Sequence, residues 1–247
     1  MSSKIGLNLT EYYSINFDLP KRDKKLIKFI IIHYTGMKNE NKAIQRLSDS
    51  NSKVSSHYFI KNSGDILNLV PDLYTAWHAG NSYWKQYKSL NRYSIGIEIN
   101  NPGHDNGYKR FTSKQISSLT KLLKFLSKKY TINKRNILGH SDISPNRKKD
   151  PGEKFPWIKL AKQKLCHWHY LDEIKIKKYR NLKIEGYEEK TFFKNLYKIG
   201  YSRIFDTKSK SNKTTLTMAF QRKFRQKLVN GKIDKECLLI SKILIKF

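Results

Sequence analysis

One histidine, two aspartates and three cationic side chains crowd into the short segment from Gly139 to Gly152. His140 and Asp150 offer a nitrogen and an oxygen ligand, and the prolines of the segment preclude one continuous helix. A catalytic zinc ion takes three protein ligands and leaves a fourth position to water. The segment therefore predicts a loop that supplies two ligands to one metal ion, the third coming from elsewhere in the chain. The alternative is a solvated surface loop without any ligand.

Three histidines outside this loop are candidates for site residues. His33 follows Leu26–Ile32, a β-branched run typical of a strand buried on both faces, and the carboxyl ends of such strands commonly carry functional groups. His78 follows Trp77 in a loop of small residues and is a rival third ligand. His57 lies in another expected strand, where a structural and a site-lining role are equally open.

A strictly alternating segment, Ser94–Asn100, predicts a strand with one apolar face. Its other face carries Gly96, Glu98 and Asn100, so we expect Glu98 to face open space and reach into a pocket. Glu98 could then take a proton from water and pass it to a leaving amine. Lys148 could stabilise the developing oxyanion. The alternative is an ordinary exposed sheet face.

The remaining hydrophobic patterns predict an α/β fold with a mixed central β-sheet flanked by helices. The segments 54–60 and 66–70 are expected to form a hairpin, and 136–138 a further strand. The clearest helix is Thr112–Tyr130, because Thr112 and Gln115 form a capping box before an apolar face of 3–4 spacing. Shorter helices are expected over 40–50 and from about 156 to 165.

The C-terminal tail predicts a small three-helix domain, from apolar patterns over 192–199, 214–228 and 237–245. The expected organisation is an irregular N-terminal arm (1–25), a catalytic domain (26–166), a linker (167–187) and a helical domain (188–247). His167 and His169, on alternate positions beside Trp168, could suggest a second metal site. No carboxylate-rich loop surrounds them, so we expect them to be structural.

The formal net charge of +30 predicts attraction to polyanions such as nucleic acid, anionic lipid or an acidic cell-wall polymer. The same composition also follows from an AT-rich coding sequence. No segment resembles a base-reading helix or an RNA-stacking motif, so no nucleic-acid partner is expected. Two distant cysteines argue against a disulfide framework. No segment has the length of a membrane span, and no signal-peptide core is recognisable.

Five motifs occur together in the chain, and each contains one or more of the candidate residues. With them the sequence resembles the type 2 N-acetylmuramoyl-L-alanine amidases, zinc enzymes related to phage amidase lysozymes and to peptidoglycan-recognition proteins. The motifs are Ile30–Thr35, Ser56–Ile60, Ala76–Gly80, Ser94–Ile99 and Gly139–Gly152.

The resemblance implies one zinc ion per chain, held by His33, His140 and Asp150, with Glu98 and Lys148 as catalytic residues. It implies hydrolysis of the amide between the lactyl group of N-acetylmuramic acid, or its 1,6-anhydro form, and the L-alanine of the stem peptide. The residues expected to bind substrate are Tyr34, His57, Trp77, His78, Asn100 and Arg147.

The tail is similar to the helical peptidoglycan-binding module, through 196–201 and 219–224. This arrangement most resembles the broad-specificity amidases of Gram-negative envelopes, and cytosolic recycling amidases are the other close branch. We therefore expect a monomer acting on peptidoglycan or muropeptides, in the cell envelope or periplasm, with the cytoplasm also open. The alternative function is a non-catalytic peptidoglycan-recognition module. Such modules have typically lost zinc ligands, whereas this sequence has all three.

Overall fold

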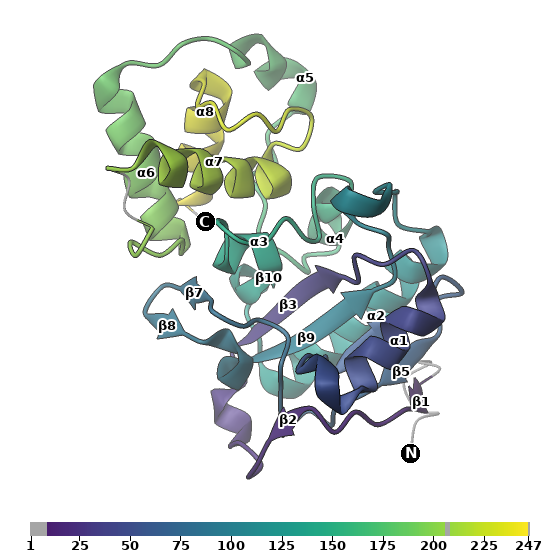
Figure 1. The fold of residues 1–247 in the computed structure, drawn as a ribbon. Helices are drawn as coiled ribbons and strands as arrows, with labels where there is room; N and C mark the ends of the chain where they lie inside the picture. Colours follow the sequence, from purple (N-terminus) through teal and green to yellow (C-terminus); the bar gives the residue numbers. More distant parts are fainter. Residues whose placement is uncertain (1–8, 206–207, 247) are drawn as a thin grey trace.

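A six-stranded mixed sheet forms the centre of the catalytic region (Figure 1). The computed structural model describes residues 9–205 and 208–246, so 1–8 of the expected arm and 206, 207 and 247 of the expected helical domain lie outside the described residues. The strand order is β1-β5-β4-β9-β3-β10, and every neighbouring pair is parallel except β4 and β5. The strands are β1 (Leu9–Glu11), β3 (Phe29–Tyr34), β4 (Tyr58–Ile60), β5 (Ile66–Asn68), β9 (Ser94–Ile99) and β10 (Ile137–Gly139). The predicted mixed sheet is confirmed.

Strand β3 is almost wholly buried, between β9 on one side and β10 on the other. The uninterrupted apolar run explains this position, because a strand with both faces covered needs no polar face. The strand begins at Phe29 and not at Leu26. Residues Lys24–Leu26 instead form a 3-10 turn, which the side chain of Asp23 caps.

Two helices cover the sheet. Helix α1 (Glu40–Ser48) packs its buried residues on β4 and β5, in a cluster of Ala43, Ile44, Leu47, Phe59, Leu67 and Leu69. Helix α2 (Ser113–Tyr130) lies in the large core cluster with the three isoleucines of β9. The predicted capping box of Thr112 and Gln115 starts α2. The predicted hairpin of β4 and β5 is also confirmed.

Within residues 9–25, part of the arm that we expected to be irregular forms two short strands. Its β1 adds a parallel edge strand beside β5, and β2 (Phe17–Asp18) pairs with β6 (Thr75–Ala76). A further small ribbon joins β7 (Tyr83–Trp84) to β8 (Tyr87–Lys88). Strands of two or three residues are too short to give a periodic signal in the sequence.

Three helices form the C-terminal part that was expected to be helical: α6 (Gly186–Ile199), α7 (Lys210–Phe224) and α8 (Lys235–Leu244). The short helix α5 (Glu173–Ile176) lies within residues 167–187, which were expected to be a linker. Gly200 ends α6 with a φ of +141°, in agreement with the expected stop. Helix α7 begins and ends four residues earlier than 214–228, because Ser209 caps its N-terminus and Arg225 leaves the helical conformation.

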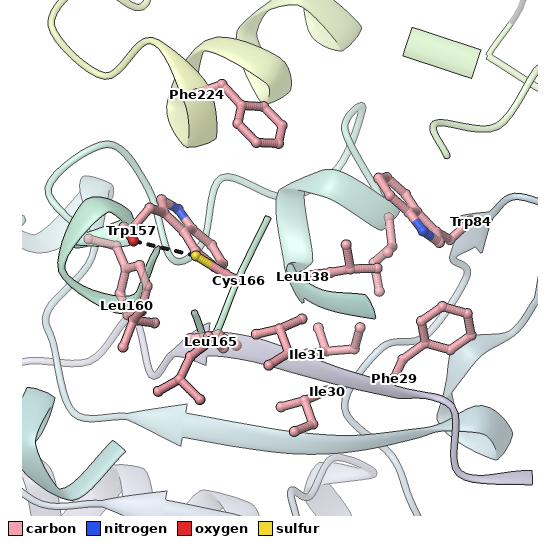
Figure 2. Packing of buried hydrophobic residues seen from close by; sticks show 14 of the residues in the cluster. Phe29, Ile30, Ile31, Trp84, Leu138, Trp157, Leu160, Leu165, Cys166 and Phe224 are labelled. Carbon is pink, nitrogen blue, oxygen red and sulfur yellow. Dashed lines mark hydrogen bonds between the residues drawn. The ribbon is translucent and has the colours of Figure 1, made fainter. Parts of the chain in front are cut away.

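The short helices α3 (His140–Ile143) and α4 (Trp157–Lys162) lie between the sheet and the C-terminal helices (Figure 1). Figure 2 shows Phe224 of α7 above Trp157 of α4, with Ile30 and Ile31 of the sheet further below. One buried apolar cluster thus runs from the sheet into the C-terminal helices. None of the helices within 9–205 and 208–246 is long and apolar enough to cross a membrane.

Candidate metal and catalytic site

The three predicted metal ligands converge on one point. His33 comes from β3, His140 opens α3 directly after β10, and Asp150 closes the following loop. His33 Nδ1 lies 2.9 Å from His140 Nδ1 and 3.0 Å from Asp150 Oδ2. His140 Nδ1 lies 3.1 Å from the same carboxylate oxygen. Two imidazole nitrogens and one carboxylate oxygen in this arrangement form a donor set that fits zinc. All three residues are buried.

The far nitrogen of His140 is engaged in a hydrogen bond that selects its tautomer. Its Nε2 lies 3.1 Å from the carbonyl oxygen of Ala79, which can accept a hydrogen bond but cannot donate one. Nε2 therefore carries the hydrogen, and the lone pair of Nδ1 points toward His33 and Asp150. A hydrogen bond from the far ring nitrogen to a carbonyl is the usual way of orienting a metal-binding histidine.

A chain of hydrogen bonds orients His33 in the same way. Its Nε2 lies 3.0 Å from His78 Nδ1, and His78 Nε2 lies 3.3 Å from Ser94 Oγ. The Ser94 hydroxyl donates to the carbonyl of Leu90 and therefore accepts from His78 Nε2. His78 Nδ1 then accepts from His33 Nε2, so each imidazole donates through its Nε2 atom. His33 Nδ1 then keeps its lone pair for a metal. His78 thus contacts the far side of the His33 ring and lies outside the group of His33, His140 and Asp150 that could hold a metal ion.

Gly96 makes room for His78. A Cβ atom at this position would lie 2.4 Å from Cγ of the His78 ring. The alternating pattern predicts open space above Gly96. This prediction is wrong, because the His78 imidazole fills that space. Only Glu98, further along the same strand face, reaches the cleft.

The buried ligands influence one another's protonation. Burial, and next the charge of His140, lowers the pKa of His33 to about 4, so this imidazole is neutral at pH 7. Burial by itself would raise the pKa of Asp150. Its two imidazole partners, His140 first, outweigh burial and hold that pKa well below its usual range. A neutral imidazole and an ionised carboxylate are the forms that bind a metal.

Glu98 lies beside this ligand set. It pairs in register with His33 across β9 and β3. Its Oε2 atom is buried and has no hydrogen-bond partner among the residues that the structure describes. Burial raises the pKa of Glu98 to about 8; the charge of Asp150 adds to this shift, and Lys148 opposes it. An unpaired buried carboxyl oxygen in a cleft is typical of a functional group.

The site opens into a cleft of about 400 Å³. The cleft is lined by the ligands, Glu98 and Lys148, and by four of the six residues expected to bind substrate: Tyr34, Trp77, His78 and Arg147. Its volume is in the range of pockets that bind small ligands.

The other two expected substrate contacts, His57 and Asn100, do not line the cleft. His57 is fully buried; its Nδ1 accepts from the backbone of Gly96, and its Nε2 lies 3.0 Å from the carbonyl of Tyr74. Asn100 is also buried, and its side chain accepts from Thr35. His57 instead packs against the ring of His78, and Asn100 contacts Thr35, and both of these partners line the cleft.

Two of the cleft-lining residues are anchored by neighbours that the sequence did not single out. Tyr34 Oη lies 2.8 Å from His104 Nδ1, and His104 Nε2 lies 3.1 Å from Glu153 Oε2. Arg147 Nη2 donates to the carbonyl oxygens of Ala79 and Asn81. His104 and Glu153 fall outside regular strand and helix patterns, and no spacing indicates that they meet.

Comparisons with known proteins agree with this geometry. A family profile described as N-acetylmuramoyl-L-alanine amidase matches residues 22–153. The chain is 32% identical over 232 residues to the N-acetylmuramoyl-L-alanine amidase AmiD of Escherichia coli (strain K12), covering 89% of this chain and 83% of AmiD. It is 37% identical over 108 residues to the 1,6-anhydro-N-acetylmuramyl-L-alanine amidase AmpD of the same organism, covering 44% of this chain and 57% of AmpD.

Solved structures show the same similarity over most of the chain. AmiD in complex with anhydro-N-acetylmuramic acid-L-Ala-D-γ-Glu-L-Lys matches with a TM-score of 0.78, covering 93% of this chain and 91% of that one at 32% identity. AmpDh3 from Pseudomonas aeruginosa, in complex with anhydromuramic pentapeptide, matches with a TM-score of 0.77 and 29% identity. That match covers 93% of this chain and 94% of AmpDh3.

Proposed function

The chain belongs to the N-acetylmuramoyl-L-alanine amidase family, and we propose that it hydrolyses the amide bond between muramic acid and L-alanine at the site of His33, His140 and Asp150. The muramic acid can be the 1,6-anhydro form, because the similar AmiD and AmpDh3 structures contain anhydromuramic peptides. The observation that carries the proposal is the meeting of three metal-binding atoms with the unpaired Glu98 Oε2 in one cleft.

We propose zinc as the metal and His33, His140 and Asp150 as its ligands. The donor set of two imidazoles and one carboxylate supports zinc over harder cations, which prefer oxygen ligands. Zinc in such a site supplies Lewis-acid polarisation of a carbonyl group and lowers the pKa of water. The hydrogen bonds from His140 to Ala79 and from His33 to His78 hold both rings in the tautomer that this role needs.

Glu98 and Lys148 are proposed to carry the proton transfers and the charge stabilisation. Glu98 Oε2 takes the proton of the attacking water and then gives it to the nitrogen of the leaving L-alanine. The raised pKa of Glu98, about 8, suits a carboxyl group that must both accept and donate near neutral pH. Lys148 lines the same cleft and would place its ammonium beside the oxygen that gains charge.

The walls of the cleft are proposed to position the substrate. Trp77 offers an aromatic surface suited to a sugar or peptide, and its Nε1 is held by Asp18 Oδ1 at 2.7 Å. Arg147 and Lys149 bring positive charge to the opening, where the free carboxylates of a stem peptide would lie. Tyr34 is fixed by His104 and can present its ring to the substrate.

The direct test is hydrolysis of a purified anhydromuramyl peptide, followed by mass spectrometry with zinc and after chelation. Release of the free stem peptide that stops on chelation and returns with zinc supports the proposal. A chain that binds the muropeptide without releasing any peptide would instead be a recognition module. A reducing muramyl peptide tested in parallel reports whether the chain prefers the anhydro form.

We also propose that the chain acts as a monomer in the cell envelope. The cleft and its proposed catalytic groups all come from one chain, and the match to the N-acetylmuramoyl-L-alanine amidase AmiD covers 89% of this chain, against 44% for AmpD. Light scattering on the purified protein, and fractionation of cells producing it, test the two parts of this proposal separately.

A further inference from the structure

Helix α7 of the C-terminal region reaches the loop that carries two of the metal ligands. Lys223 Nζ donates to Asp142 Oδ2 at 3.0 Å and to the carbonyl oxygen of Ile137 at 3.1 Å. The Lys223 and Asp142 side chains are only 4% and 1% exposed, so solvent screens this ion pair very little. Asp142 lies two residues after His140, on the same short helix α3. The pair thus joins the C-terminal region to the short helix that begins at a metal ligand.

Asp142 is a point where three segments meet. Besides Lys223, its carboxylate accepts from the backbone N–H of Gly139 at 2.8 Å, which fixes the turn into His140. It also accepts from Tyr201 Oη at 2.8 Å, from the segment after α6. All of these donors are buried, so each carboxylate oxygen is satisfied without water.

The other end of the ligand loop is held by the residues that follow α7. Gln226 Nε2 donates to the carbonyl oxygens of Glu153 and Phe155, at 2.8 and 2.7 Å. These carbonyls come just after Asp150. The C-terminal region therefore contacts the chain at two places: just after His140, at Asp142, and just after Asp150, at Glu153 and Phe155.

We propose that Lys223, Tyr201 and Gln226 are positioning residues that hold His140 and Asp150 in metal-binding geometry. This inference rests on the proposed metal site. It means that the C-terminal helices are part of the catalytic apparatus, whether or not they also bind peptidoglycan.

The proposed role differs from a general contribution to stability. A buried ion pair is weak evidence for added stability, because desolvation offsets its attraction. It is, however, a directional constraint: Lys223 Nζ and Tyr201 Oη approach different oxygens of Asp142 and so fix the orientation of its carboxylate. Removing partners behind a metal ligand typically weakens metal affinity by about 10- to 100-fold. Asp142 acts on His140 through the backbone, so we expect the lower end of that range.

The test measures zinc affinity by competition with a chromophoric chelator, in Lys223→Met, Tyr201→Phe and Gln226→Ala. The matched control is Arg180→Met, which removes a cation that pairs with Glu236 at 2.7 Å inside the C-terminal region and does not touch the ligand loop. We expect the zinc dissociation constant to rise about tenfold in Lys223→Met, and less in Tyr201→Phe and Gln226→Ala, which remove neutral hydrogen-bonding groups. The Arg180→Met variant should lose thermal stability but keep the zinc affinity of the wild type.

Equal zinc affinity in all four variants would overturn the inference, even if each is less stable. If Lys223→Met does not fold, the zinc affinities of Tyr201→Phe and Gln226→Ala still test the inference, because each of these variants removes one neutral hydrogen-bonding group. Equal weakening in Arg180→Met would also overturn it, since the effect would then follow stability alone. If the wild type binds no zinc, the proposed metal site itself is wrong. If the wild type binds zinc and the variants bind it equally well, only the positioning role is wrong.

Discussion

His33 and Glu98 occupy paired positions on the neighbouring parallel strands β3 and β9. Residues paired in register project from the same face of a sheet, so this pairing places a metal ligand beside the unpaired carboxyl group. A slip of one residue would turn one of the two side chains to the opposite face. The buried isoleucines that alternate with Glu98 prevent such a slip, because it would bring them into the cleft. The packing of the core thereby sets the geometry of the site.

Replacing Glu98 with glutamine keeps the shape of the side chain and removes its ability to accept a proton. We expect the rate of stem-peptide release to fall by about 10²- to 10⁴-fold, as for other general acid–base groups. Zinc content, measured by mass spectrometry of the metal, should equal that of the wild type. The control is Glu173→Gln, an exposed glutamate in α5. A turnover within a few-fold of wild type in Glu98→Gln would exclude the assigned role.

Replacing His140 with alanine removes one of the three ligands. We expect the variant to lose both zinc and activity. Zinc at 100 times its dissociation constant should stabilise the wild type by about 2.7 kcal/mol and leave His140→Ala unchanged. Thermal unfolding with and without zinc measures this difference. If the variant keeps its zinc-dependent stabilisation, the ligand set is incorrect.

Replacing His78 with phenylalanine fills the same space above Gly96 but removes the acceptor for His33 Nε2. We expect zinc affinity to fall by about 10- to 100-fold, because His33 loses the partner that sets its tautomer. The measurement is the zinc dissociation constant, with KM for the muropeptide in parallel. A raised KM at unchanged zinc affinity would indicate that His78 binds substrate, as the sequence had suggested.

Acid should weaken the attachment of the C-terminal helices. His167 Nε2 donates to the carbonyl of Leu244, and His169 Nε2 donates to that of Phe224. Burial lowers the pKa of each imidazole to about 4, below the usual value near 6.5. As the pH falls below 6.5, these two imidazoles therefore take up protons in the unfolded chain before they do so in the folded chain. The stability due to the neutral imidazoles is complete above pH 6.5 and is lost as the pH falls to 4 and below.

The measurement is the unfolding temperature of metal-free protein between pH 7 and pH 4. The double variant His167→Gln/His169→Gln should lose less stability over this range than the wild type, because it lacks both titrating groups. His33 titrates in the same range and is present in both proteins, so the comparison isolates the two interface histidines. An identical loss in both proteins would contradict the prediction.

Much of the site could be predicted from the sequence because its parts lie on strongly patterned elements. The apolar run of β3 indicated that His33 ends a buried strand, and the alternation of β9 placed Glu98 on the face opposite the isoleucines. The ligand loop was recognisable because its ionisable residues and prolines are close in sequence. These signals come from residues close together in the sequence, and the hydrophobic periodicity of such a segment indicates the strand or helix that it forms.

The remaining features depend on contacts between distant residues. In the sequence His78 is a rival candidate for the third ligand, whereas its packing over Gly96 and its contacts with His33 and Ser94 depend on residues far apart in the chain. Asp142 and Lys223 are 81 residues apart and carry no shared pattern. The division of the chain into a catalytic and a helical domain stays a prediction, and Phe224 packs in the same core cluster as Ile31.

The central claim is that water attacks the lactyl carbonyl carbon of muramic acid and releases the stem peptide as an amine. Hydrolysis of an anhydromuramyl peptide in ¹⁸O-labelled water, with mass spectrometry of both products, measures this directly. We expect one ¹⁸O atom in the carboxylate of the anhydromuramic acid, and an unlabelled peptide with a free L-alanine amine. Label in the peptide, or cleavage at another bond, would contradict the account.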